Sequence, residues 1–176
     1  MRDSFRTNVE FAAQIVVAIA VVVVAGLLIK RLVFTQPPRA LNVPRISAGE
    51  RLNLPDVDWK QNKKTLVFFL NKDCHYCTSS APFYRELIDE ASKQNVTLLA
   101  VLPNSAEESR AYVQSIKLPI DDIRTGPLAP YKIPGTPAVL FVNSNGTVER
   151  VWFGDASGRE KQIREEFLTS VEKTVD

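Results

Sequence analysis

The chain contains two cysteines, Cys74 and Cys77, and they are separated by only two residues. Residues 65–70 before them form an apolar, strand-like run, and a helix-like stretch follows. A cysteine at the start of a helix lies near unpaired backbone N–H groups, which favour a thiolate over a thiol. The thiolate is the attacking species in thiol–disulfide exchange, and a second cysteine nearby can resolve the mixed disulfide. Spacing and placement therefore predict a redox pair.

His75 and Tyr76 lie between the two cysteines and are candidates for tuning the pair or holding a substrate. A protonated imidazole at His75 would stabilise a thiolate and make the disulfide more oxidising, but an unperturbed histidine is mostly neutral at pH 7. An exposed loop position is the alternative for His75. We expect Tyr76 to be a surface aromatic that helps to hold a client protein.

Composition excludes several other classes of site. The single histidine and the two cysteines cannot fill a four-ligand zinc site without distant carboxylates or a second chain, so we expect no metal. The net charge is +2, and lysine and arginine form no basic stripe with interleaved aromatics, so we expect no nucleic-acid partner.

The N-terminal region predicts an anchor in a lipid bilayer. Residues 1–8 form a short polar tail. The predicted anchor at residues 9–34 contains an apolar run at residues 11–29, interrupted by Gln14 and Gly26, and with its apolar flanks it is long enough to cross a hydrocarbon core of about 30 Å as a helix. A cleaved signal peptide has a shorter apolar region and a small-residue cleavage site, so an uncleaved single-pass anchor is the preferred interpretation and cleavage the alternative. Prolines then make residues 35–45 a semi-rigid linker.

Two observations point to opposite sides of the membrane for the main domain. More arginine and lysine follow the apolar run than precede it, which by the positive-inside rule places the main domain in the cytoplasm. An exported disulfide chemistry and the usual layout of a signal anchor favour the opposite side. We expect the redox domain on the extracytoplasmic, periplasmic side.

Residues 46–176 are expected to form one α/β domain. The pattern runs strand, helix, strand, helix, strand, hairpin and helix, with a short edge strand near residues 46–54, helices at residues 82–95 and 105–115, and a strand at residues 118–124. Asn145-Gly146 is a strong hairpin signal, and Ser157 to Glu160 resembles a capping box that opens the last helix. This order predicts a mixed central sheet covered by helices on both faces.

This order of strands and helices, together with the motifs that it contains, resembles the thioredoxin fold. Pro82, five residues after the second cysteine, matches that family's kinking proline, and Gly135-Thr136-Pro137 before a strand is similar to its cis-proline loop. The end of the hairpin, at Trp152-Phe153-Gly154, is also similar. Membrane-anchored members with an extra helix and strand, here residues 105–124, form the TlpA/ResA group. The resemblance implies that Thr136 and Pro137 lie beside the disulfide and bind the client backbone.

Two residues depart from the thioredoxin pattern. Phe68 stands where the family has a buried aspartate that helps proton transfer during resolution, and Asp73 replaces the usual tryptophan before the first cysteine. Asp73 is the nearest substitute base in the sequence, although we expect it to be an exposed, solvated acid. A carboxylate there would also oppose a thiolate at Cys74.

These observations predict a membrane-tethered enzyme, a thiol–disulfide oxidoreductase in which Cys74 attacks and Cys77 resolves. We expect it to act as a reductant of protein clients, with no cofactor, and to be recharged by a membrane or soluble redox partner. Two alternatives remain: a non-enzymatic binding or assembly module on the same fold, and a thiol peroxidase. Asn71 argues against the peroxidase, because those enzymes normally have Thr or Ser three residues before the cysteine.

Overall fold

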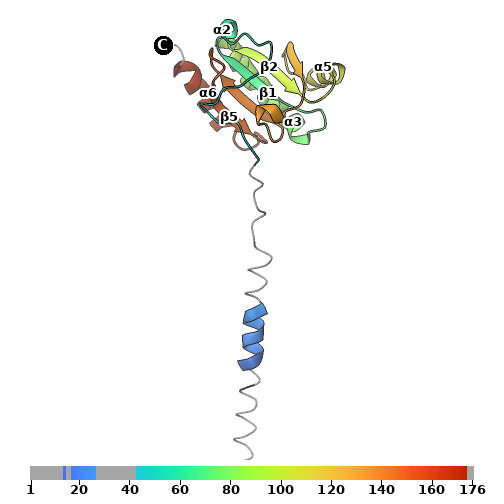
Figure 1. Cartoon of the computed structure of the whole chain (residues 1–176), viewed down its shortest axis with the longest axis vertical. Helices are drawn as coiled ribbons and strands as arrows, with labels where there is room; N and C mark the ends of the chain where they lie inside the picture. Colours follow the sequence, from blue (N-terminus) through green and yellow to red (C-terminus); the bar gives the residue numbers. More distant parts are fainter. Residues whose placement is uncertain (1–13, 15–16, 27–42, 174–176) are drawn as a thin grey trace, which may run out of the picture. The chain divides into compact units, whose positions relative to one another are not determined.

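The computed structural model describes residues 14, 17–26 and 43–173 (Figure 1). Residues 17–26 are helical and form part of a unit separate from the domain that begins at residue 43. The predicted tail at residues 1–8, most of the predicted anchor at residues 9–34 and residues 35–42 of the predicted linker lie outside the described residues. In the described part of the chain, no helix combines the length and the apolar character needed to span a membrane.

A five-stranded mixed sheet forms the centre of the domain. In the order β3-β2-β1-β4-β5, neighbouring strands β1, β2 and β3 run parallel, whereas β4 is antiparallel to both β1 and β5. The predicted mixed sheet is therefore confirmed. The strands are β1 (Thr65–Phe69), β2 (Thr97–Leu102), β3 (Asp122–Thr125), β4 (Ala138–Val142) and β5 (Val148–Phe153).

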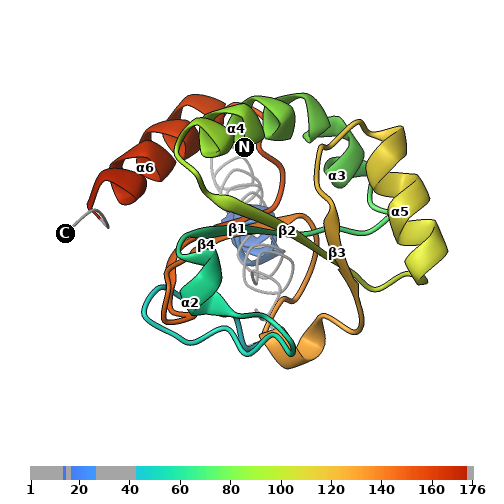
Figure 2. The ribbon, with the colours of Figure 1, turned by 90° about the horizontal axis from the view of Figure 1, so that it is seen from above.

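Helices cover the two faces of the sheet unequally. Figure 2 shows α4 and α6 on one side and the short α2 on the other, with α3 and α5 on the side of α4. The helices are α2 (Trp59–Asn62), α3 (His75–Ser79), α4 (Ala81–Lys93), α5 (Ala106–Ser115), the 3₁₀ turn η1 (Ala129–Tyr131) and α6 (Glu160–Lys173).

Strand β1 divides the core because its alternate side chains point to opposite faces. Leu66 and Phe68 pack with α4, α5 and α6. Val67 and Phe69 pack with residues from the extended segment before β1 and from η1. All four side chains are fully buried, which explains why this strand is a continuous apolar run rather than an alternating pattern.

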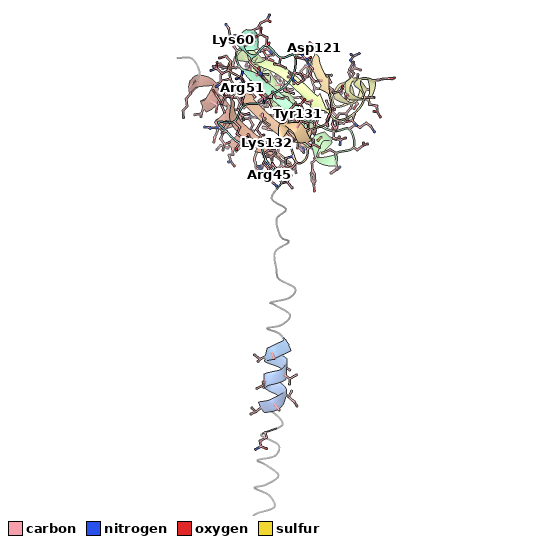
Figure 3. The ribbon with its side chains drawn as sticks, viewed as in Figure 1. Arg45, Arg51, Lys60, Asp121, Tyr131 and Lys132 are labelled. Carbon is pink, nitrogen blue, oxygen red and sulfur yellow. The ribbon has the colours of Figure 1, made fainter. Side chains whose placement is uncertain are left out.

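The extended segment before β1 covers the second face without forming a strand. Only the pair Arg51–Thr147 makes a bridge, so the predicted edge strand near residues 46–54 is wrong. The segment is instead held by separate backbone bonds, including Ile46 N–H to the Lys132 carbonyl at 3.0 Å. Figure 3 shows Arg45 and Lys132 close together at this place.

Several predicted boundaries shift in the structure. The helix predicted at residues 105–115 is confirmed: Ser105 and Glu108 form a capping box in front of α5. The strand predicted at residues 118–124 begins only at Asp122. The predicted capping box at Ser157 does not form, because the Ser157 N–H donates to Asp155 and α6 starts at Glu160.

Candidate active site

The two cysteines lie where the predicted strand gives way to a helix. Cys74 is the N-cap residue of α3, with extended backbone angles, and Cys77 lies within that helix. The Cys74 backbone N–H donates to the Asn71 carbonyl at 3.1 Å, which closes the turn after β1. Both thiols are free in this structure. Strand β1 therefore delivers the pair to the edge of the core.

The two sulfur atoms have different surroundings. Cys74 Sγ accepts a hydrogen bond from the Cys77 backbone N–H at 3.2 Å and donates one to the Thr136 carbonyl at 3.3 Å. Cys74 is half-buried, whereas Cys77 has no exposed surface. Only the first sulfur is accessible to a large partner.

Burial changes the acidity of the second cysteine. It raises the pKa of the Cys77 thiol from 9.0 to about 12, and the neighbouring Cys74 sulfur acts in the same direction. Cys77 is consequently a thiol at neutral pH. Any reaction in which Cys77 attacks must include the removal of its proton.

The loop before β4 completes the site. The Thr136–Pro137 peptide bond is cis, as predicted for the proline in this loop. The Thr136 carbonyl accepts a hydrogen bond from the Cys74 thiol, so this loop and the start of α3 lie side by side. Thr136 and Pro137 are thus brought to the cysteine pair from a position more than 60 residues later in the sequence.

Asp73 lies at the surface beside Cys74, as expected from the sequence. Its carboxylate is 3.1 Å from Lys72 Nζ, and Lys72 also lies 3.6 Å from Glu108 on α5. Asp73 raises the pKa of Lys72, so the ammonium group stays charged. Lys72 therefore offsets part of the negative charge that Asp73 places next to Cys74.

His75 and Tyr76 project from the first turn of α3 into solvent. Tyr76 is 56% exposed, and the His75 ring packs edge-on against it with 5.7 Å between ring centroids. An exposed aromatic next to a reactive sulfur is a suitable contact for a protein partner. Both residues are therefore exposed at the surface, directly after Cys74 in the chain.

Sequence reasoning missed the polar residues behind the cysteine pair. Ser80 is 3% exposed, and its hydroxyl donates to Asp155 at 2.9 Å. Thr78 and Tyr112 form a second hydroxyl contact at 3.1 Å. The signal available in the sequence was Ser80 itself, a polar residue three positions after Cys77 on the face of the helix that must be buried.

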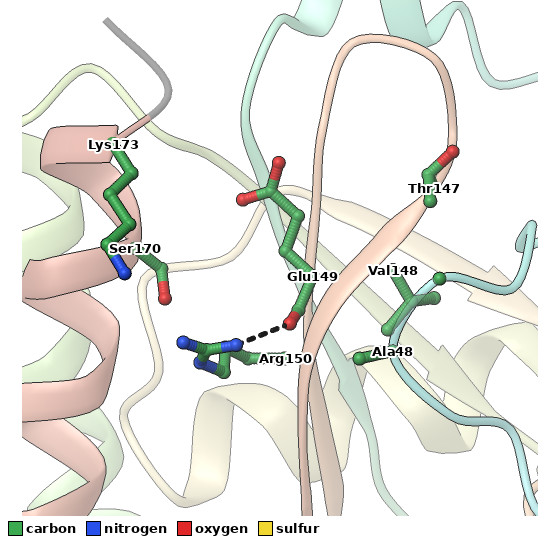
Figure 4. A pocket seen from close by; sticks show the side chains of 8 residues that line it. Ala48, Thr147, Val148, Glu149, Arg150, Ser170 and Lys173 are labelled. Atoms are coloured by element: carbon green, nitrogen blue, oxygen red, sulfur yellow. Dashed lines mark hydrogen bonds between the residues drawn. The ribbon is translucent and has the colours of Figure 1, made fainter.

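The described residues form no cluster of metal ligands, and one pocket of the domain lies away from the cysteine pair. Among the described residues, no three His, Cys, Asp or Glu side chains gather closely enough to hold a metal ion. The pocket in Figure 4 lies between α6 and the Val148 end of β5, whereas the Phe153 end of this strand pairs with Ala138 beside the cis-proline. Its Arg150 guanidinium donates to the Glu149 carbonyl. This pocket is separate from the cysteine pair.

Comparison with known proteins agrees with this architecture. The sequence model described as the AhpC/TSA family matches residues 37–151. No curated protein sequence matches the chain.

Solved structures with the same fold cover most of this chain. A Chlorobium tepidum protein assigned as the thiol:disulfide interchange protein DsbE has a TM-score of 0.59 and 15% identity, covering 72% of this chain and 99% of its own. The thioredoxin domain of a Bacteroides vulgatus thiol-disulfide oxidoreductase has a TM-score of 0.55 and 18% identity, covering 69% of this chain and 98% of its own. A thiol:disulfide interchange protein from Bacteroides sp. has a TM-score of 0.53 and 19% identity, covering 71% of this chain and 85% of its own. The predicted thioredoxin-like fold is confirmed.

Proposed function

The chain belongs to the AhpC/TSA family, and we propose that it is a thiol–disulfide oxidoreductase that exchanges electrons with protein clients through Cys74 and Cys77. One observation carries the proposal: beside the cis-proline loop, the half-buried Cys74 sulfur accepts a hydrogen bond from the backbone N–H of Cys77, whose side chain is fully buried. A pair with one accessible and one protected thiol suits exchange in two successive steps.

In the reducing direction, the Cys74 thiolate attacks one sulfur of a client disulfide. A bond forms between Cys74 and the client, and the other client sulfur leaves with the electron pair. Cys77 then loses its proton and attacks Cys74, which releases the second client sulfur and leaves the Cys74–Cys77 disulfide. A redox partner must supply two electrons and two protons to restore the dithiol.

Client recognition is assigned to the residues around Cys74. Tyr76 is exposed at the mouth of the site, with His75 against it. Thr136 offers backbone groups next to the Cys74 sulfur, and Pro137 fixes that loop. An extended client segment lying along this loop would bring its own sulfur to Cys74.

We assign residues 9–34 to a single-pass membrane anchor, with residues 1–8 as a tail, residues 35–45 as a linker and residues 46–176 as the redox domain. The apolar length of the sequence supports the anchor. The redox pair supports an extracytoplasmic, periplasmic location, and the resemblance to the TlpA/ResA group supports action as a reductant. Extraction of membranes with alkaline carbonate tests the anchor: the full chain should stay in the pellet, and a chain starting at residue 43 should not.

Trapping of clients tests the redox function. Cys77→Ser in the full chain should accumulate mixed disulfides on Cys74, visible as slower bands that disappear with a reductant. The matched controls are Cys74→Ser and the double variant, which should trap nothing. If Cys77→Ser traps no client, or if the double variant keeps full function in cells, the binding-module alternative replaces this proposal.

The reduction potential decides the direction of electron flow. Equilibration with glutathione or dithiothreitol, read by thiol trapping, should give a value near or below about −220 mV for a reductant. A value near about −120 mV would indicate an oxidant instead. Catalytic consumption of peroxide by the reduced chain would favour the thiol peroxidase.

A further inference from the structure

The edge of the sheet that holds the cysteine pair continues to the end of β5. Phe69 pairs with Ala138, and Ala138 pairs with Phe153, so these three residues form one row across β1, β4 and β5. Cys74 follows β1 and Pro137 precedes β4. The residue after Phe153 donates its backbone N–H to the Pro137 carbonyl at 2.8 Å. The cis-proline loop therefore lies between Cys74 and the end of β5.

Two arginines from distant parts of the sequence contact Phe153. The Arg45 guanidinium carbon lies over the Phe153 ring, 5.8 Å from the ring centroid. Arg159 Nη2 donates to the Phe153 carbonyl at 2.9 Å and to the Asp155 carbonyl at 2.7 Å. Both arginine side chains are exposed, and Figure 3 shows Arg45 where the extended segment joins the domain. The end of β5 thus carries two guanidinium groups at the surface.

The charges of these two guanidinium groups are not neutralised by a direct partner. In the part of the chain that the structure describes, neither group forms an ion pair, whereas Lys132 nearby pairs with Glu50. Glu166 senses the charge of one of them, but its carboxylate accepts hydrogen bonds from Trp152 and Gln162. A guanidinium has five N–H donors, so both groups keep donors for an external carboxylate.

The opposite side of Cys74 is negatively charged. The exposed Asp73 carboxylate lies 3.1 Å from Lys72 Nζ, and the Glu108 carboxylate on α5 lies 3.6 Å from the same nitrogen. Glu107 is exposed in the same first turn of α5. Three carboxylates therefore surround one ammonium group. A segment that crosses Cys74 meets negative charge on one side and positive charge on the other, and such rim charges select partners.

We propose that Arg45 and Arg159 form an acid-recognition subsite, which binds Asp or Glu side chains on one defined side of the client cysteine. The client segment lies along the cis-proline loop and places its acidic residues at Phe153. Guanidinium groups suit this task because they pair with carboxylates through two parallel hydrogen bonds. The subsite selects the partner and does not touch the reacting sulfurs. It deepens the proposed function and rests on it.

Three synthetic peptides test the subsite in the full chain, kept in a nonionic detergent. Each peptide has one cysteine in a mixed disulfide with thionitrobenzoate, flanked by two aspartates before it, by two aspartates after it, or by asparagines on both sides. The Cys74 thiolate attacks the peptide sulfur, the Cys74–peptide disulfide forms, and thionitrobenzoate leaves with the electron pair and is read by its colour.

At low ionic strength, one acidic peptide should react faster than the neutral peptide. The other acidic peptide should gain nothing, because its aspartates lie against Asp73 and Glu108. Salt at about 0.5 M should remove the advantage of the favoured peptide, since exposed charges are then screened.

Single variants assign this advantage to the two arginines. Arg45→Gln and Arg159→Gln should each reduce it by about two- to fivefold, the range of an exposed ion pair, and leave the neutral peptide unchanged. Arg45→Lys keeps the charge and should keep most of the advantage. The matched control is Arg51→Gln, because Arg51 is also exposed in the segment before β1 but bridges to Thr147 at the opposite end of β5. It should change no rate.

Three results overturn the subsite. They are equal rates for all three peptides, an equal advantage for both acidic peptides, which would reflect only the net charge of the chain, and a loss in Arg51→Gln as large as that in Arg45→Gln. An unchanged advantage in Arg45→Gln has the same meaning. This variant decides the question if Arg159→Gln, which loses two contacts to the β5–α6 loop, does not fold.

The subsite and the proposed function fail in different ways. If Cys77→Ser traps clients but the three peptides react equally, only the subsite falls. If the wild-type chain releases no more thionitrobenzoate than Cys74→Ser from any peptide, Cys74 does not attack disulfides, and both proposals fall together.

Discussion

The two faces of the sheet are both buried, but their side chains differ in polarity. The face under α3, α4 and α6 contains both cysteines and several buried or half-buried polar groups, including the Ser80–Asp155 contact and the Trp152 indole N–H donating to Glu166 at 2.7 Å. The opposite face is an apolar cluster formed by the segment before β1 and by η1. A face that performs chemistry needs protected polar groups with partners, whereas a supporting face needs only close packing.

Phe68 and Phe69 provide the sharpest way to separate these two roles. They are adjacent in β1 and both fully buried, but the Phe68 ring packs on Tyr84 at 5.5 Å and the Phe69 ring on Tyr131 at 5.9 Å. Phe68→Ala and Phe69→Ala should each lower the free energy of unfolding by about 3–5 kcal/mol, measured in urea. Only Phe68→Ala should also slow disulfide exchange by the cysteine pair, followed with 5,5′-dithiobis(2-nitrobenzoic acid), because Phe68 packs in the same cluster as Cys77 and Phe69 does not.

Equal slowing in the two variants would contradict this difference between the faces, since Phe69 packs on the side of the sheet away from both cysteines. A conservative Phe68→Leu should lie between wild type and Phe68→Ala in both measurements. If Phe68→Ala loses stability and keeps the wild-type rate, the reactivity of the cysteine pair does not depend on this packing.

Gly146 tests the supporting face alone. It has a positive φ of +77°, and an added Cβ would lie 2.9 Å from Trp59, whose indole closes this side of the core. Gly146→Ala should lower the free energy of unfolding by about 1–3 kcal/mol, through overpacking and backbone strain, with no change in the rate of disulfide exchange by the cysteine pair. Gly49→Ala is the matched control, because Gly49 also has a positive φ but has no atom within 4 Å of the added Cβ. If both variants lose the same stability, the contact with Trp59 contributes nothing.

The sequence predicted the parts of the molecule that depend on local patterns. Continuous apolar runs indicated β1, β2 and β4, and the Asn145-Gly146 turn indicated the hairpin. The spacing of Cys74 and Cys77 indicated that the two cysteines lie together at the start of a helix. The polar contact between Ser80 and Asp155 behind the cysteine pair could not be predicted in this way. Asp155 approaches Ser80 across 75 positions, and only the packing of the β5–α6 loop on the α3–α4 junction brings them together. A buried serine near a cysteine is visible in the sequence, but its partner is not.

The same limit explains the wrong edge strand near residues 46–54. Alternating apolar residues there do bury Ile46, Leu52 and Leu54, as a strand would. The segment is instead tied at separate points, such as Leu52 N–H to the Gly146 carbonyl at 2.8 Å, so the ladder of a strand does not form. Apolar alternation predicts which side chains are buried, while continuous pairing depends on a partner strand in register.

The acidity of Cys77 gives the last test of the contrast between the two faces. Its pKa is raised from 9.0 to about 12 by burial, so the folded chain retains a proton that the unfolded chain loses above about pH 9. The contribution to stability is therefore complete below pH 9 and is lost as the pH rises toward 12. Between pH 8 and 10, the reduced wild-type chain should lose about 1 kcal/mol more free energy of unfolding than Cys77→Ala, because each pH unit in this window costs at most about 1.4 kcal/mol. Urea unfolding in a non-thiol reductant measures it, and Tyr84 and the lysines titrate alike in both chains. The same loss in Cys77→Ala would show that burial of this thiol does not oppose its ionisation.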